Sequence, residues 1–125
     1  MPRPDFKIPR NIVPTPVNHD ELIDEIITRV ENVGEQFKDQ LQISGRSDIW
    51  AVGDVTGRSR KRSVFGVIYM IPKKCRTPKV RHAFGEAVKT AIQDGFEEVC
   101  GFRPGIDLPI RVVPRLDYIE ADDKH

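Results

Sequence analysis

The chain has 125 residues, of which 31% are charged and 38% are apolar, and its formal net charge is +1. This length and composition are typical of one soluble domain that buries a core without disulfides. No apolar run approaches the ~20 residues of a membrane helix, and the first residues lack the apolar segment of a signal peptide. We therefore expect an intracellular, cytoplasmic protein with no membrane partner.

The charges are segregated along the chain although the net charge is small. Residues 43–82 carry ten basic and two acidic side chains. The segment before it (19–42) carries seven acidic and two basic ones, and the segment after it (83–125) carries nine acidic and five basic ones. Such a concentrated basic zone indicates a surface that docks onto an anionic partner.

Residues 1–17 are rich in proline, which fixes φ and biases the preceding residue towards an extended backbone. The segment also contains apolar side chains, such as Phe6 and Ile8, that could cover part of the domain. We interpret it as an extended arm that lies along the body of the protein or reaches a neighbouring copy.

A helix is predicted from His19 to about Leu41. Asn18 and Glu21 have the spacing of an N-terminal capping pair, and the acidic first turn suits the positive end of the helix dipole. Apolar residues recur every three or four positions and form a stripe on one side of this helix.

Two strands rich in β-branched and aromatic residues follow, at 48–56 and 61–71. The intervening Gly57-Arg58-Ser59-Arg60 is typical of a turn, so we expect an antiparallel β-hairpin. A second helix is predicted from Pro78 to about Val99, with Thr77 as its N-cap. A last strand is expected at about 108–113.

The predicted fold class is α+β, in the order α-β-β-α-β, with an antiparallel hairpin-based sheet and two helices packed on one face. The domain is expected to span 18–114, between the arm (1–17) and an acidic C-terminal tail (115–125). Two helices cannot cover both sheet faces, and the second face is too apolar to be left in water. We therefore expect a homo-oligomer whose interface contains Trp50, Val52, Phe65, Val67 and Tyr69.

Two basic groups are candidate anion-binding sites. The hairpin tip places four cations within five residues, which repel one another unless a polyanion binds. The second group leads into the second helix, whose free N–H groups attract anions. The candidate binding residues are Arg58, Arg60, Lys61 and Arg62 at the tip, and Lys73, Lys74, Arg76, Lys79 and Arg81 before and within the helix start.

No residue pattern forms a catalytic or metal-binding signature, and Cys75, His82 and Cys100 match no zinc motif. The sequence alone thus favours a non-enzymatic module without a cofactor that binds nucleic acid, DNA or RNA, through backbone electrostatics. One alternative is a homo-oligomeric assembly protein in which basic and acidic surfaces of neighbouring copies dock. A third hypothesis is a small metal-dependent nuclease that uses carboxylates such as Asp48 and Asp54.

Overall fold

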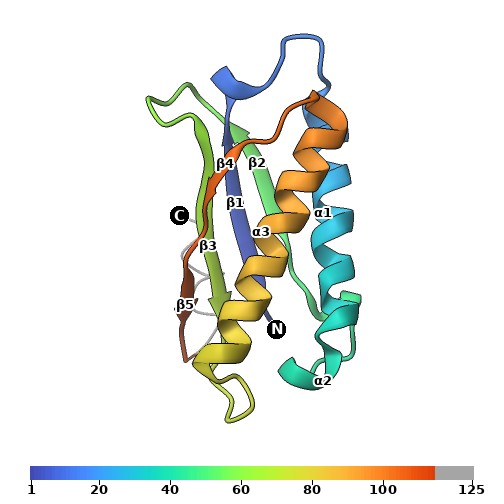
Figure 1. Ribbon diagram of the computed structural model, residues 1–125, viewed down its shortest axis with the longest axis vertical. Helices are drawn as coiled ribbons and strands as arrows, with labels where there is room; N and C mark the ends of the chain where they lie inside the picture. The colour runs from blue at the N-terminus through green and yellow to red at the C-terminus, as the bar shows by residue number, and fades with distance from the viewer. Residues whose placement is uncertain (115–125) are drawn as a thin grey trace.

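The computed structural model describes residues 1–114, so the predicted acidic tail lies outside the described residues. The elements follow one another along the chain (Figure 1) as β1 (Arg3–Pro9), the 3₁₀ turn η1 (Arg10–Ile12), α1 (His19–Gln36), α2 (Lys38–Leu41), the 3₁₀ turn η2 (Arg46–Asp48), β2 (Val52–Thr56), β3 (Ser63–Met70), α3 (Pro78–Cys100), β4 (Gly105–Asp107) and β5 (Ile110–Val112).

The strands form one mixed sheet in the order β2-β1-β3-β4, and β5 pairs with β3 beyond β4. β1 runs parallel to β2 and antiparallel to β3, whereas β4 and β5 run parallel to β3. The α+β class is therefore confirmed, but the predicted hairpin is wrong. The two strands that flank the turn at 57–60 do not pair with each other, because β1 lies between them.

β1 comes from the segment that the sequence placed in an extended arm. It is extended, as the prolines predict, but it is a central strand of the sheet (Figure 1). Its inward residues Phe6 and Ile8 are fully buried, and this burial outweighs the cost of placing proline in a strand. Pro4 precedes the first pair with β2 and Pro9 forms the last one, so the missing N–H groups lie at the ends of that ladder.

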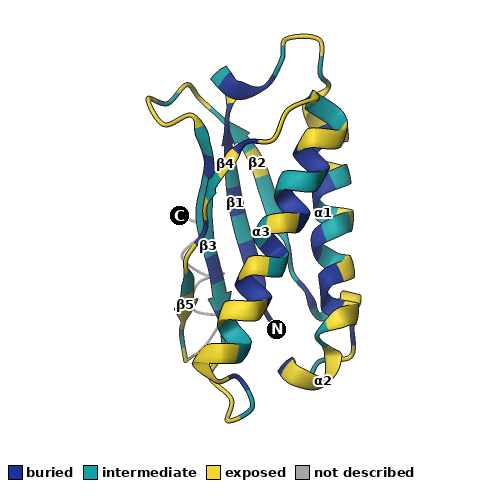
Figure 2. Ribbon diagram, in the orientation of Figure 1, coloured by how far each residue is buried: buried dark blue, intermediate teal, exposed yellow. Residues whose placement is uncertain are grey.

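α1 and α3 lie side by side on one face of the sheet, and the core fills the space between helices and sheet (Figure 2). The caps are those that the sequence predicts. The Asn18 side chain accepts a hydrogen bond from the Glu21 N–H at 3.1 Å, and the Thr77 hydroxyl accepts one from the Val80 N–H at 3.3 Å. Leu41, expected at the end of the first helix, belongs to the short α2 that follows α1.

The chain consists of two β-α-β units related by an approximate two-fold axis. β1-α1-β2 and β3-α3-β4/β5 each hold a parallel pair of strands connected by a helix, and β1 and β3 join the units antiparallel. No repeat is visible in the amino-acid sequence. The arrangement brings the loop after β1 to one end of the sheet and the loop after β3 to the other (Figure 1).

The sheet face away from the helices is called here the open face. Successive strand residues point to opposite faces, so Phe65, Val67 and Tyr69 point away from the buried Val64 and Ile68. Val52 shares the open face, because Val52 and Val67 both pair with Asp5 of β1. Among residues 1–114, no helix packs on this face (Figure 1). Nor does any helix within that range combine the length and apolarity needed to span a membrane.

Candidate functional site

The N-terminal residues enter the sheet where β3 ends. Pro2 is buried, and its carbonyl oxygen accepts a hydrogen bond of 2.9 Å from the Trp50 N–H. Met1, in contrast, is 48% exposed. The chain therefore passes from solvent into a packed environment within one residue, and the backbone nitrogen of Pro2 lies at that boundary.

Arg76 is the most deeply buried cation near this point, with only 2% of its surface exposed. Its Nε and one terminal nitrogen donate to the Leu41 carbonyl at 3.2 and 3.0 Å, and the other terminal nitrogen donates to the Ile71 carbonyl at 2.9 Å. Leu41 ends α2, so Arg76 satisfies a carbonyl that the helix leaves without an internal partner. Burial lowers the pKa of Arg76, and no carboxylate within the described part of the chain forms an ion pair with it.

The buried charge of Arg76 affects the pKa of the N-terminal amine. Burial lowers the pKa of the Met1 amine most, the Arg76 and Lys73 cations lower it further, and Asp48 opposes them. Desolvation and nearby like charges both disfavour the protonated amine. A lowered pKa increases the fraction of the amine that is neutral at a given pH, and the neutral amine is the form that can act as a base or nucleophile.

Lys73 and Asp48 complete the group that surrounds the N-terminus, which we call the N-terminal site (Pro2, Asp48, Lys73 and Arg76). Lys73 is exposed, and its Nζ donates to the Gln42 carbonyl at 3.4 Å. The Asp48 carboxylate accepts from the Ser44 N–H at 2.6 Å, and this hydrogen bond lowers the pKa of Asp48. The site thus combines an amine, one accessible cation, one buried cation and one ionised carboxylate.

The predicted anion-binding residues are divided between the two ends of the sheet. The tip residues lie in the loop between β2 and β3, at the end opposite the N-terminal site (Figure 1). Lys73 and Arg76 join the N-terminal site, but Arg76 is buried and does not present its guanidinium to solvent as predicted. Lys79 and Arg81 lie in the first turn of α3, where the Arg81 guanidinium donates to the Arg76 carbonyl at 2.8 Å.

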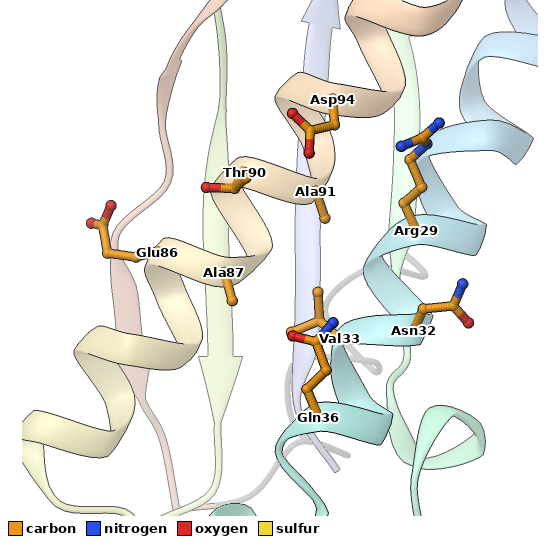
Figure 3. A pocket seen from close by; sticks show the side chains of 9 residues that line it. All are labelled: Arg29, Asn32, Val33, Gln36, Glu86, Ala87, Thr90, Ala91 and Asp94. Carbon is orange, nitrogen blue, oxygen red and sulfur yellow. The ribbon is translucent and has the colours of Figure 1, made fainter.

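Metal binding and the groove between the helices are less favourable alternatives to this group. Within residues 1–114, no cluster of three His, Cys, Asp or Glu residues could hold a metal ion. A groove of about 460 Å³ runs between α1 and α3 (Figure 3), over a floor that includes Ala87 and Ala91. Its charged side chains are already engaged, Arg29 with Glu25 at 2.8 Å and Asp94 with Arg103 at 2.6 Å. The groove therefore offers little chemistry.

Sequence reasoning missed Pro2 as a site residue. The residue types around it were visible, but the burial that changes the amine depends on β1 being a central strand. The available signal was a Met-Pro dipeptide followed by apolar residues at alternating positions, such as Phe6 and Ile8, and the proline content of the segment obscured it.

Comparison with known proteins identifies the fold. No protein-family model and no curated protein sequence matches the chain. Solved structures do match. A fused 4-OT symmetric trimer aligns with a TM-score of 0.57 at 9% identity, over 90% of this chain and 85% of that one. The protein Pt0534, inactivated by 2-oxo-3-pentynoate, gives 0.58 at 10% identity over 89% and 85%. A malonate semialdehyde decarboxylase (FG41) inhibited by 3-bromopropiolate gives 0.50 at 12% identity over 98% and 96%.

These matches show a tautomerase-like fold. They also correct the functional interpretation of the sequence. The neighbours include a tautomerase (4-OT is 4-oxalocrotonate tautomerase) and a decarboxylase, which are enzymes that act on small molecules. The prediction of a non-enzymatic nucleic-acid-binding module is therefore wrong. The alternative of a homo-oligomeric protein agrees better with these neighbours, one of which is a symmetric trimer. The nucleic-acid prediction rested on the charge of exposed loops, and a charged loop can be exposed simply because water solvates it.

Proposed function

We propose that the chain is a small homo-oligomeric enzyme that moves a proton next to a carbonyl group of a small carboxylic acid. Removal of Met1 would leave Pro2 as the N-terminal residue, with a secondary amine as general base. The observation that carries this proposal is the N-terminal entry itself: Pro2 is buried, and burial together with the Arg76 and Lys73 cations lowers the pKa of the Met1 amine one residue before it.

The chemistry of the structural neighbours supports an acid as substrate. Malonate semialdehyde, 2-oxo-3-pentynoate and 3-bromopropiolate are each a small carboxylate with a carbonyl group or an activated triple bond. An anionic acid suits the excess of positive charge at the N-terminal site. Lys73 is the accessible cation and would hold the carboxylate, whereas Arg76 is saturated by backbone carbonyls and acts through its field.

In the proposed reaction, the neutral Pro2 amine takes a proton from the carbon next to the substrate carbonyl. The electron pair of that C–H bond moves onto the carbonyl oxygen and forms an enolate. The nearby cations stabilise the negative charge as it develops. The protonated amine then returns the proton to another position, so atoms and charge balance over the cycle.

The pH dependence of the amine gives a test in which two variants shift in opposite directions. Lys73→Gln removes a cation that lowers the amine pKa, so this pKa rises. Asp48→Asn removes a carboxylate that raises it, so the pKa falls. Because the neutral amine is the active form, the rising limb of kcat/KM against pH moves to higher pH in Lys73→Gln and to lower pH in Asp48→Asn.

The same two shifts should appear in the ¹⁵N resonance of Pro2, measured by NMR without substrate. Lys74→Gln is the matched control, because this neighbouring lysine is exposed and does not contribute to the amine shift. Equal shifts in Lys73→Gln and Lys74→Gln, or shifts of the same sign in Lys73→Gln and Asp48→Asn, would refute the assignment.

The open face supports the oligomeric part of the proposal. Phe65, Val67 and Tyr69 are half-buried, and with Val52 they supply the apolar side chains of the open face, where Asp5 lies between Val52 and Val67. A second copy can cover these apolar side chains. One structural neighbour is described as a symmetric trimer. We therefore propose that the predicted interface residues, Trp50 included, form the contact between copies in a homotrimer.

Phe65→Lys combined with Val67→Lys should convert the trimer into monomers of 14.3 kDa, because buried lysines leave uncompensated charges in an interface. Sedimentation equilibrium measures the mass. Thr90→Lys, on the solvent side of α3, should leave the trimer intact. A wild-type chain that sediments as a monomer at high concentration would contradict the proposed oligomer. The proposed role of the amine is tested separately, by the pH dependence of the Lys73 and Asp48 variants.

A further inference from the structure

We propose that the chain has a second small-anion site at the end of the sheet opposite Pro2. The site, called here the distal pocket, is a hollow of about 430 Å³ lined by Arg10, Asn11, Val13, Thr15, His19 and Arg58. Its ligand is a small oxyanion, a carboxylate or phosphate group, and it binds without reaction. The proposal rests on the distal pocket alone and does not depend on the chemistry proposed for Pro2.

The approximate two-fold axis of the fold makes the two ends of the sheet comparable. At the N-terminal site, the segment leading into β1 meets the loop that follows β3. At the distal pocket, the segment leading into β3, which carries Arg58, meets the loop that follows β1, which carries Arg10 (Figure 1). Both ends therefore place cationic side chains of one loop beside the entry of the neighbouring central strand.

The chemistry of the lining favours an anion. Two guanidinium groups and an imidazole surround the hollow, and no carboxylate lines it. Neither Arg10 nor Arg58 forms an ion pair with any residue of the described range 1–114. In the groove between the helices, in contrast, Arg29 is paired with Glu25. The cations of the distal pocket thus remain available for an external oxyanion, which guanidinium groups can grip with two hydrogen bonds.

The pocket is also held together by the fold. The Asn11 side-chain oxygen accepts a hydrogen bond of 2.9 Å from the Ser59 N–H, which ties the loop containing Arg58 to the loop containing Arg10. This bond leaves the amide nitrogen of Asn11 as a further donor beside the hollow. Buried Val13 also lines the hollow, so its wall combines hydrogen-bond donors with an apolar side chain.

The two ends differ in one respect that decides what each can do. The segment that enters β3 is in the middle of the chain, so its backbone nitrogens are amides, which are neither basic nor nucleophilic. The distal pocket therefore has cationic side chains, as the N-terminal site does, but it has no basic amine. It is suited to binding an oxyanion and not to moving a proton.

The test is a titration of the full wild-type chain with inorganic phosphate and, separately, with malonate, followed by ¹H–¹⁵N NMR. Ionic strength is held constant with sodium chloride so that screening does not vary. We expect saturable shifts of the amides of residues 10–19 and of Ser59 with at least one of the two probes. The probe that binds more tightly identifies the oxyanion as phosphate-like or carboxylate-like.

Arg58→Ala should weaken this binding about tenfold or more, because it removes a charge-assisted hydrogen bond to the ligand. Lys61→Ala is the matched control. It removes the same charge from the same exposed loop but does not line the pocket, and its affinity should stay within about twofold of wild type. Equal losses of affinity in both variants would mean that the anion is attracted by the general positive charge of the loop and not by the distal pocket. Shifts confined to residues 48 and 71–77, or no saturable shift at all, would also overturn it.

Discussion

Extra residues in front of Pro2 should remove almost all catalysis. A chain that begins Gly-Ser-Pro, as a cleaved affinity tag would leave it, converts the Pro2 amine into an amide. Since an amide nitrogen is not basic, we expect kcat to fall roughly a thousandfold, the range that a well-placed general base provides. The readout is the ketonisation of the enol of a small 2-oxo acid, followed by ultraviolet absorbance.

A covalent inhibitor, applied to the wild-type chain and to the Gly-Ser-Pro chain, tests directly whether the Pro2 amine is the reactive group. An acetylenic 2-oxo acid should add covalently to the free Pro2 amine, since the N–H adds across the triple bond and nothing leaves. Intact mass then rises by one inhibitor per chain, and the modification maps to the N-terminal peptide. The Gly-Ser-Pro chain should gain no adduct at Pro2. Substantial activity in that chain, or an adduct on a lysine in the wild type, would contradict the assignment of Pro2.

Pro2→Ala is the control for the amine itself. It leaves a primary amine at the same place in the fold and should retain part of the activity. A wild-type chain whose intact mass still includes Met1 would be expected to behave like the extended chain, because its Pro2 nitrogen is also an amide. The mass of the protein therefore has to be measured before its activity is interpreted.

Local chemistry made the helices predictable. Asn18 and Thr77 cap the helices as the sequence indicates, because a capping side chain interacts with a backbone N–H only three residues away. The sheet was different. The strand pairs are set by contacts between residues far apart in the chain, such as Asp5 with Val52 and with Val67, and no local signal reports them. A turn-like sequence at 57–60 then suggested a hairpin that does not exist.

The face of each strand residue was predictable even though the pairing was not. Side chains alternate along a strand whatever lies beside it, so Phe65, Val67 and Tyr69 share a face in either arrangement. Inserting β1 between the two strands leaves Val52 on the same face as Val67, because both pair with Asp5. The interface prediction drawn from this alternation remains to be tested.

The candidate site was predictable only in part. Lys73 and Arg76 were found as cations, but their role depends on what surrounds them. Arg76 is enclosed by the carbonyls of Leu41 and Ile71, which lie 35 and five residues before it in the chain. A sequence reports the charge of such a residue but not its burial. The shift in the amine pKa follows from that burial, so it could not be foreseen either.

Gly66→Ala is expected to be the most destabilising small substitution in the sheet. Gly66 pairs with Phe6 in the β1–β3 ladder, next to the central pair of Asp5 and Val67. A Cβ at this position would collide with the Asp5 carbonyl oxygen, and it would lie 2.9 Å from the Phe6 Cα and 3.0 Å from the Asp5 carbonyl carbon. These are backbone atoms of a central strand, so they cannot move aside as the end of a side chain could.

We expect Gly66→Ala to lower the free energy of unfolding by about 4 kcal/mol or more, which is a large part of the 5–15 kcal/mol typical of a domain. Urea denaturation measures this free energy, and a chain that fails to fold is the extreme of the same result.

Gly101→Ala is the first control. Gly101 has a φ of 85° and nothing within 4 Å of an added Cβ, so only the left-handed backbone penalty of about 1 kcal/mol applies. Gly57→Ala, in open space without positive φ, should change stability by less than about 1 kcal/mol. Because the three variants add the same methyl group, their order isolates the collision with β1. A Gly66→Ala chain as stable as Gly101→Ala would mean that β1 does not lie against β3 at this point, and the position of Pro2 at the start of β1 would have to be revised with it.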